Sequence, residues 1–356
     1  MPRPLDRRAS GLLLPATVLA VLLLGLLGHV WLWHATVRGI EEGMARWAAE
    51  RQAAGWIVSY GRPERGGWPF SASVRFPSLL IASAPTSALA FAWSAGRAEA
   101  RIVPPDFSEV LIDLPDPQIL VLEDLDLRFA AERLLLRLPV EGGSPLGGRV
   151  EAERLRLAAP ERLPEHVLQA ERLIATLQLR PDATEAESAL TLSLRALGIT
   201  LPRPGPFGAR VEEAALTLAA SGPLPGRRGL RARAEIWRDA GGSVALSGLR
   251  LLYGPVEAEG EATLALDESL QPMGAGRLAI SGFEPALAAL AEAGALARPA
   301  AVHAAIALRL IARSPEAGAP AWVEVPLLLE NRTLSVLRIP LLRLPPLPWP
   351  SVEPGH

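Results

Sequence analysis

Cysteine and lysine are absent from this chain, and aromatic residues make up only 5% of its 356 positions. Without cysteine there can be no thiol nucleophile, zinc–thiolate site or disulfide. Without lysine there can be no Walker A motif, no Schiff base and no kinase-type strand lysine. These absences exclude several large classes of enzyme and leave the cellular compartment open.

The chain also lacks an excess of either charge. Its 36 basic and 38 acidic residues give a formal charge of -2, and the two signs are interleaved along the sequence. Binding to a phosphate backbone requires a concentrated basic patch, and none is present. The composition therefore predicts no nucleic-acid partner.

One long segment lacks charge altogether. No Asp, Glu or Arg occurs between Arg8 and Arg38, and residues 11–35 are long enough to cross a bilayer of about 30 Å at 1.5 Å per residue. The run does not end in the small residues of a cleavage site, which favours an uncleaved signal anchor over a signal peptide. Three arginines but only one acid precede it, so the positive-inside rule predicts a cytoplasmic N-terminus, residues 1–10.

Two tryptophans, Trp31 and Trp33, stand near the end of this run, where we expect them to lie at the far membrane interface. Helical spacing continues through residues 36–54, which predicts a juxtamembrane helix. Gly55 is placed to end it. Nearly all of the chain would then lie across the membrane from its N-terminus.

From Trp56 onward, apolar and polar residues alternate with the period of a β-strand. Short turn sequences separate these segments, which predicts an antiparallel meander over a β-rich domain at 55–345, followed by an irregular tail at 346–356. Two alternating segments are assigned to one apolar face of the sheet, with these residues: Leu230, Ala232, Ala234 and Ile236 in the first, and Val256, Ala258, Gly260, Ala262, Leu264 and Leu266 in the second.

Two late segments, 284–297 and 298–313, have helical composition, and Val302, Ile306 and Leu310 of the second share one face. We expect both helices to pack on the sheet. The predicted fold is therefore mainly β with an N-terminal transmembrane helix, in which a large antiparallel meander curves into a groove or open barrel.

No residue pattern identifies a reaction. Glu257, Glu259 and Glu261 share a strand face and could hold a cation, but ion pairing with Arg231 and Arg233 is the favoured interpretation. The five histidines are too scattered for a zinc site or a triad. The segment 241–243 resembles half of a nucleophile elbow, yet a hairpin turn is preferred. We therefore predict no catalytic residue, metal or cofactor, and no enzyme.

Six motifs carry a resemblance to a known family: GWIVSY (55–60), GWPF (67–70), WRDAGGSVAL (237–246), YGPVEAEGEATLALD (253–267), QPMG (271–274) and VPLLLENRTLSVLRIPL (325–341). The chain resembles domain of unknown function family 2125, a group of uncharacterised bacterial envelope proteins, although it has Trp68 where the family more often has Phe. The resemblance implies a β-rich fold and an inner-membrane protein whose bulk lies in the periplasm; it implies no reaction. A weaker, fold-level likeness is to AsmA-type envelope proteins.

Two functional hypotheses follow. In the first, the anchored protein binds or shuttles membrane lipid in an apolar groove, because two helices are too few to cover so many strands, and small residues such as Ala258, Gly260 and Ala262 leave room for acyl chains. In the alternative, the core is filled and the protein is a membrane-tethered scaffold for other envelope proteins.

The scarce aromatics are concentrated where the helix meets the domain. We expect Trp56, Ile57 and Val58 to begin the first strand and residues 68–70 to begin the second, and we expect the aromatic cluster to fix the sheet to the helix. Contact of Trp56 and Trp68 with lipid headgroups is the alternative. The cluster comprises Trp47, Trp56, Tyr60, Trp68 and Phe70.

Overall fold

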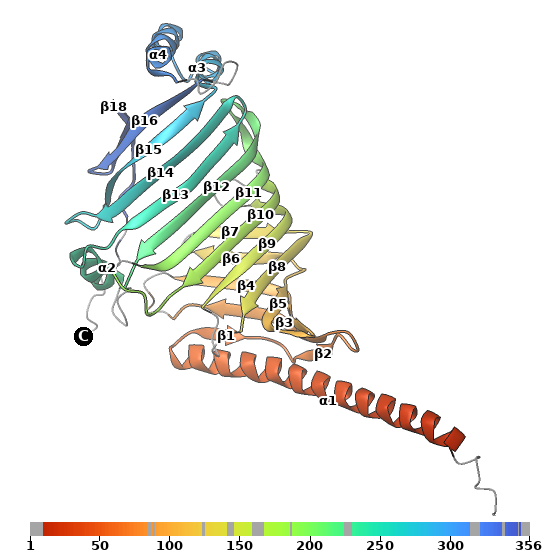
Figure 1. Ribbon diagram of the computed structural model, residues 1–356. Helices are drawn as coiled ribbons and strands as arrows, with labels where there is room; N and C mark the ends of the chain where they lie inside the picture. The colour runs from red at the N-terminus through yellow and green to blue at the C-terminus, as the bar shows by residue number, and fades with distance from the viewer. Residues whose placement is uncertain are drawn as a thin grey trace, which may run out of the picture.

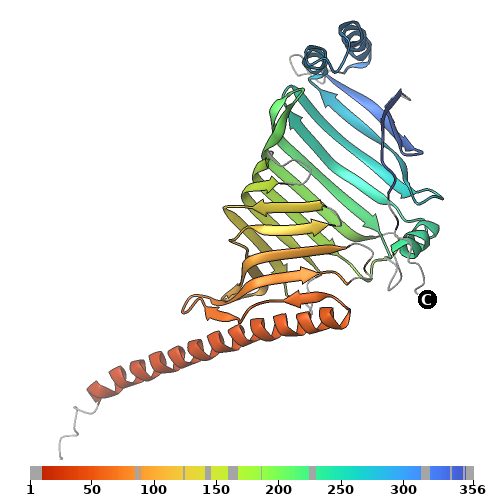
Figure 2. The same cartoon turned by 180° about the vertical axis from the view of Figure 1, so that it is seen from behind.

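The computed structural model consists of one long helix, a single large β-sheet and three short helices (Figure 1, Figure 2). It describes residues 10–349 with the exception of 85–86, 88–89, 123–124, 141–145, 159–166, 186, 224–229, 314–320, 337–338 and 348.

The N-terminal helix, α1, runs without interruption from Ser10 to Ala53. At 1.5 Å per residue its 44 residues extend about 66 Å. It ends as predicted, because Gly55 takes the left-handed conformation (φ +85°). The side chains of residues 17–28 are all exposed, with Leu24 68% accessible, and the helix is long and apolar enough to cross a membrane.

Among the described residues, 18 strands form one sheet. The remaining elements, in chain order, are β1 (Ile57–Ser59), β2 (Glu64–Gly66), β3 (Ala72–Ala82), β4 (Phe91–Val103), β5 (Asp106–Asp113), β6 (Gln118–Leu122), β7 (Leu125–Ala130), β8 (Arg133–Pro139), β9 (Gly147–Ala158), β10 (Val167–Leu179), β11 (Ser188–Gly205), β12 (Gly208–Ser221), α2 (Leu230–Asp239), β13 (Val244–Tyr253), β14 (Val256–Leu266), β15 (Pro272–Ser281), α3 (Phe283–Glu292), α4 (Arg298–Ile311), β16 (Trp322–Glu330), β17 (Thr333–Val336) and β18 (Ile339–Arg343).

The sheet is an antiparallel meander, as predicted. β5 and β6 pair with two successive parts of β4, and β7 and β8 pair with two successive parts of β9. β5 and β6 together therefore take the place of one long strand, as do β7 and β8. From β9 onward each strand pairs with the next in sequence, through to β18. β1 and β2 share the outer edge of β3, and no register among the described residues joins that edge to β18. The mainly β fold is confirmed.

The second half of α1 packs on the sheet at β3 and β4. Val37 and Ile40 are buried there against Val74 and Phe76. A bidentate pair from Arg65 to Glu41, with atoms 2.7 and 2.9 Å apart, joins β2 to the same helix. This hydrogen-bonded guanidinium lowers the pKa of Glu41 and keeps the carboxylate charged. The first half of the helix projects beyond the sheet (Figure 1, Figure 2).

The two late helices form at the end of the sheet far from α1 (Figure 1). Phe283 of α3 is buried with Val323 and Val325 of β16, so this pair of helices covers part of the sheet as expected. The predicted apolar stripe of α4 does not pack on the sheet, because Val302, Ile306 and Leu310 are all exposed to solvent.

The assignment of Leu230, Ala232, Ala234 and Ile236 to a strand is wrong, because residues 230–239 form helix α2. Leucine, alanine, arginine and glutamate all favour helices, and so short a segment fits either period. Ala234 is buried, and Trp237, three positions later, donates from Nε1 to the Ser221 carbonyl at 2.9 Å. The apolar face of the sheet therefore contains no residue from this segment.

Two turns also differ from expectation. Trp68, Pro69 and Phe70 form the turn between β2 and β3 and do not begin a strand. The Gly241–Ser243 segment links α2 to β13, so it is not a hairpin turn, and the helix-to-strand order is the reverse of a nucleophile elbow. Of the predicted tail, the described residues 346, 347 and 349 lie outside strands, while the residues from 350 onward are outside the described part of the chain.

Candidate functional site

The registers place an uninterrupted apolar face on one side of the sheet. Directly opposed residues on neighbouring strands share a face. One row begins under α1 at Val74 and ends in the middle of the sheet at Leu216, and every member is apolar. Its members, from β3 to β12, are Val74, Ala100, Ile112, Leu136, Val150, Ala175, Leu194 and Leu216.

A second apolar row lies beside the first and continues toward the C-terminal edge. Strands are about 4.8 Å apart, so the row from β10 to β17 is about 34 Å long, similar to the hydrocarbon thickness of a bilayer. We call this row the apolar stripe. It consists of Leu177, Leu192, Leu218, Leu246, Ala262, Gly276, Leu327 and Val336.

Within the described part of the chain, the segment after β18 reaches this face at Leu344, but it leaves most of the apolar stripe uncovered. Its members are half-buried or exposed, and none is fully buried. At the ends of the same face the situation differs. Val74 is buried beneath α1, and Val323 is buried beside α3. The face is therefore closed at its two ends and open between them.

A hollow of about 190 Å³ lies on this open part of the face. An apolar cavity of about 150 Å³ is enough to bind benzene, so the hollow can take part of an acyl chain but is smaller than most ligand pockets. Leu344 from the segment after β18 contributes to its wall. Leucines of four other strands line it with Ala262, namely Leu246, Leu249, Leu264, Leu327, Leu329 and Leu334.

The predicted strand from Val256 to Leu266 is confirmed, and its apolar residues do face away from Glu257, Glu259 and Glu261. The expectation that Gly260 leaves room on this face is wrong. A Cβ there would lie 2.8 Å from the Arg277 carbonyl oxygen and 2.9 Å from Leu278 Cδ1. Glycine at this position permits close approach of neighbouring backbones and does not create space for a ligand.

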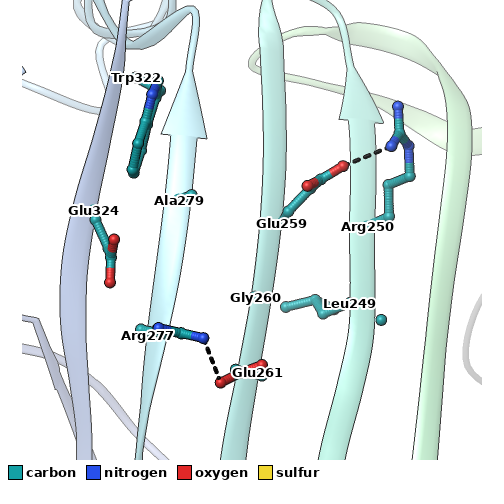
Figure 3. A pocket seen from close by; sticks show the side chains of 10 residues that line it. Leu249, Arg250, Glu259, Gly260, Glu261, Arg277, Ala279, Trp322 and Glu324 are labelled. Atoms are coloured by element: carbon teal, nitrogen blue, oxygen red, sulfur yellow. Dashed lines mark hydrogen bonds and ion pairs between the residues drawn. The ribbon is translucent and has the colours of Figure 1, made fainter. Parts of the chain in front are cut away.

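The opposite face of the sheet is charged and internally paired (Figure 3). Arg250 binds Glu259 at 2.5 Å and Glu257 at 3.0 Å, and Arg277 binds Glu261 at 2.9 Å. The ion-paired interpretation of the three glutamates is thus confirmed, but the predicted partners, Arg231 and Arg233, are wrong because they lie on α2.

This charged face contains a larger hollow, of about 510 Å³, between β13 and β16. Trp322 and Glu324 flank it in Figure 3. Its arginines are already neutralised by glutamates, and the described residues contain no group of three or more His, Asp or Glu that could hold a metal ion. The apolar face is therefore the better candidate for a binding site.

Comparison with protein families links the chain to known bacterial proteins. A family model described as an uncharacterized protein conserved in bacteria (DUF2125) matches residues 31–345. The chain belongs to this family. The DUF2125 match begins at Trp31, near the point where α1 first contacts the sheet, and extends through β18. No curated protein and no solved structure matches the chain. The likeness to AsmA-type proteins therefore stays a prediction.

The aromatic residues near the start of the DUF2125 match divide into two groups. Trp56 packs edge-on against Phe91 of β4, and Tyr60 packs against Phe76 of β3, with ring centroids 5.3 and 5.4 Å apart. Trp47 is half-buried on α1. Trp56 also lies beneath the Arg51 guanidinium of α1, and Tyr60 packs in the core with Met44 of α1, so these two residues lie between the helix and the sheet.

The other aromatics lie at the turn between β2 and β3. Trp68 is partly exposed, and its ring centroid lies 5.9 Å from that of Trp33 on α1. Phe70 is 86% accessible, so it makes little contact with the helix or the sheet. Trp31 is also exposed, whereas Trp33 is half-buried because this turn packs against it.

Sequence reasoning missed most of the residues that line the hollow. Val325, Leu327 and Leu329 alternate with other residues in β16, but the apolar Leu328 between them obscures the face. The register of β15 against β16 resolves it: Leu327 opposes Gly276, and Leu328 opposes Ala275 on the charged side. Only the strand pairing could have identified these residues.

Proposed function

We propose that this DUF2125 protein is a non-enzymatic, membrane-anchored lipid-binding protein, and that acyl chains bind along the apolar stripe. The observation that carries the proposal is an apolar face that continues across the sheet and stays uncovered between its two ends. Leaving such a surface in water costs about 25 cal/mol per Å² of apolar area. A bound lipid would remove that cost.

The proposal also places the β-sheet in the periplasm. Arg3, Arg7 and Arg8 precede the apolar helix, which favours a cytoplasmic N-terminus, and the sheet would then lie in the periplasm. The first apolar row begins beneath the docked half of α1, so the face is continuous from the membrane anchor to the hollow. This continuity would let lipid move between the membrane and the sheet.

A scaffold role is the second candidate, and one observation favours it. Val302, Ile306 and Leu310 form an exposed apolar stripe on α4, at the far end of the sheet from α1. Such a stripe is typical of helices that contact another protein. In this alternative the partner would be another envelope protein, and the sheet would hold α4 at a fixed distance from the membrane.

Mass spectrometry of bound lipid tests the proposal. We expect a secreted piece, residues 29–356, purified without detergent, to carry close to one phospholipid per chain. This piece omits the exposed half of α1, which would bind lipid by itself, and keeps the contacts from His29 onward. A folded, monomeric and lipid-free preparation would contradict lipid binding and favour the scaffold.

A further inference from the structure

Two turns meet at one end of the sheet, beside the point where α1 leaves it. The turn after β2 contains Trp68 and Phe70, and the turn between β4 and β5 is flanked by Val103 and Phe107. The pairing of Ala72 with Ile102 brings both turns to the same end of their strands. All four of these side chains are exposed, and we call them the apolar rim.

The first turn is held against α1 by specific contacts. Trp33 donates from Nε1 to the Ser71 carbonyl at 2.9 Å, and His29 Nε2 lies 2.7 Å from the Pro69 carbonyl oxygen. The Trp68 ring stacks at an angle on His29, with centroids 4.9 Å apart. The rim is therefore fixed at the level of residues 29–33 of the helix.

This level coincides with the edge of the segment suited to cross a membrane. From Ser10 to Gly28 the helix extends about 28 Å at 1.5 Å per residue, close to the thickness of a bilayer core of about 30 Å. The described side chains of this segment from Thr17 onward are all exposed, and the contacts with the sheet begin at His29.

The direction of the helix puts the rim on the membrane side of the sheet. Trp33 contacts the start of β3, Val37 and Ile40 pack farther along it, and Gln52 donates to the Val58 carbonyl of β1, whose neighbour on β3 is Ile81. α1 thus runs alongside β3 in the same direction. The start of β3 points the same way as the exposed half of α1 (Figure 1).

We propose that the apolar rim is a second membrane contact, in which Trp68, Phe70, Val103 and Phe107 enter the interfacial layer of the bilayer that α1 crosses. Aromatic side chains favour this layer because it accepts both a ring and a polar edge. Asp106 follows the second turn as the first residue of β5, and hydrogen bonds from Ser108 lower its pKa. Its charge limits insertion to headgroup depth.

Two contacts fix the sheet relative to the membrane, whereas a helix alone leaves it free to rotate about the helix axis. The inference rests on one part of the proposed function, the membrane crossing by α1. It does not depend on whether the sheet binds lipid, so the two proposals can fail separately.

Spin-label accessibility tests the rim, and the absence of cysteine makes single labels possible without other changes. The full chain carries Phe70→Cys or Phe107→Cys, each with a nitroxide label, in vesicles of phosphatidylethanolamine and phosphatidylglycerol. Phe70 and Phe107 are exposed, so neither change removes a buried side chain. We expect collisions with a water-soluble nickel complex to be reduced severalfold at both positions relative to the Leu310→Cys control, because labels in the interfacial layer are shielded from bulk water.

Leu310 is a matched control because it is 82% accessible, similar to Phe70, but lies on α4 at the far end of the sheet. If a label at position 70 or 107 collides with the nickel complex as often as one at position 310, the proposed contact of the rim with the membrane is contradicted. A Leu23→Cys label reports on α1 itself. If that label is protected while 70 or 107 is not, only the rim fails; if it too is accessible, the membrane crossing fails with it.

Discussion

The Val37→Asp substitution is expected to release the second half of α1 from the sheet and to lower the free energy of unfolding by on the order of 3 kcal/mol or more. Val37 is fully buried against the apolar face, where Val74 and Phe76 surround it. The change removes a buried apolar side chain and places a carboxylate in contact with those residues. Chemical denaturation followed by tryptophan fluorescence measures the loss.

Ala45→Asp is the matched control for this substitution. It places the same carboxylate on the same helix, at an exposed position outside the predicted transmembrane segment. We expect its effect to stay within about 0.5 kcal/mol. Equal stability of the two variants would contradict the docking of α1 on the sheet, and with it the continuity of the apolar face from the membrane.

The Leu327→Asp substitution is expected to reduce bound lipid by about tenfold or more, because a carboxylate would replace apolar contact with two or three methylenes, each worth about 0.8 kcal/mol. Leu327 lies in the apolar stripe, lines the hollow and is half-buried. Lipid per chain is measured by mass spectrometry on residues 29–356, as for the unchanged sequence.

Leu328→Asp provides the control. It makes the same chemical change one residue away, but Leu328 points to the charged side of the sheet and is exposed. Lipid content should be unaffected there. If both variants lose lipid equally, the loss reflects general destabilisation of β16 and does not support binding on the apolar face.

The elements that could be predicted from the sequence are those whose periodicity is unambiguous. The charge-free run of α1 and the alternation of β14 both have one interpretation, and both are confirmed. Residues 230–236 also alternate, yet they form α2, because seven residues are too few to separate the two periods and their helix propensity is high. The same error led to the wrong choice of Arg231 and Arg233 as ion-pair partners of the glutamates on β14, because both arginines lie on α2.

The candidate site could be predicted only in outline, because it depends on strand register. The alternation of Val256, Ala258 and Ala262 indicates an apolar face, but it does not indicate that Leu246 of β13 and Leu327 of β16 lie in the same row, with β14 and β15 between them. The lack of space at Gly260 results from the close approach of β15, which no local pattern encodes. The position of Trp68 beside His29 likewise depends on a contact between distant segments.

Photo-crosslinking tests lipid binding on the apolar face most directly. A benzophenone amino acid replaces Leu327 or, separately, Leu328 in the full chain, in bacterial cells, and the irradiated protein is weighed by mass spectrometry. The account predicts an added phospholipid mass at position 327 and none at 328, because the two side chains point to opposite faces of the same strand. Lipid adducts at both positions, or no lipid adduct at 327, would contradict it.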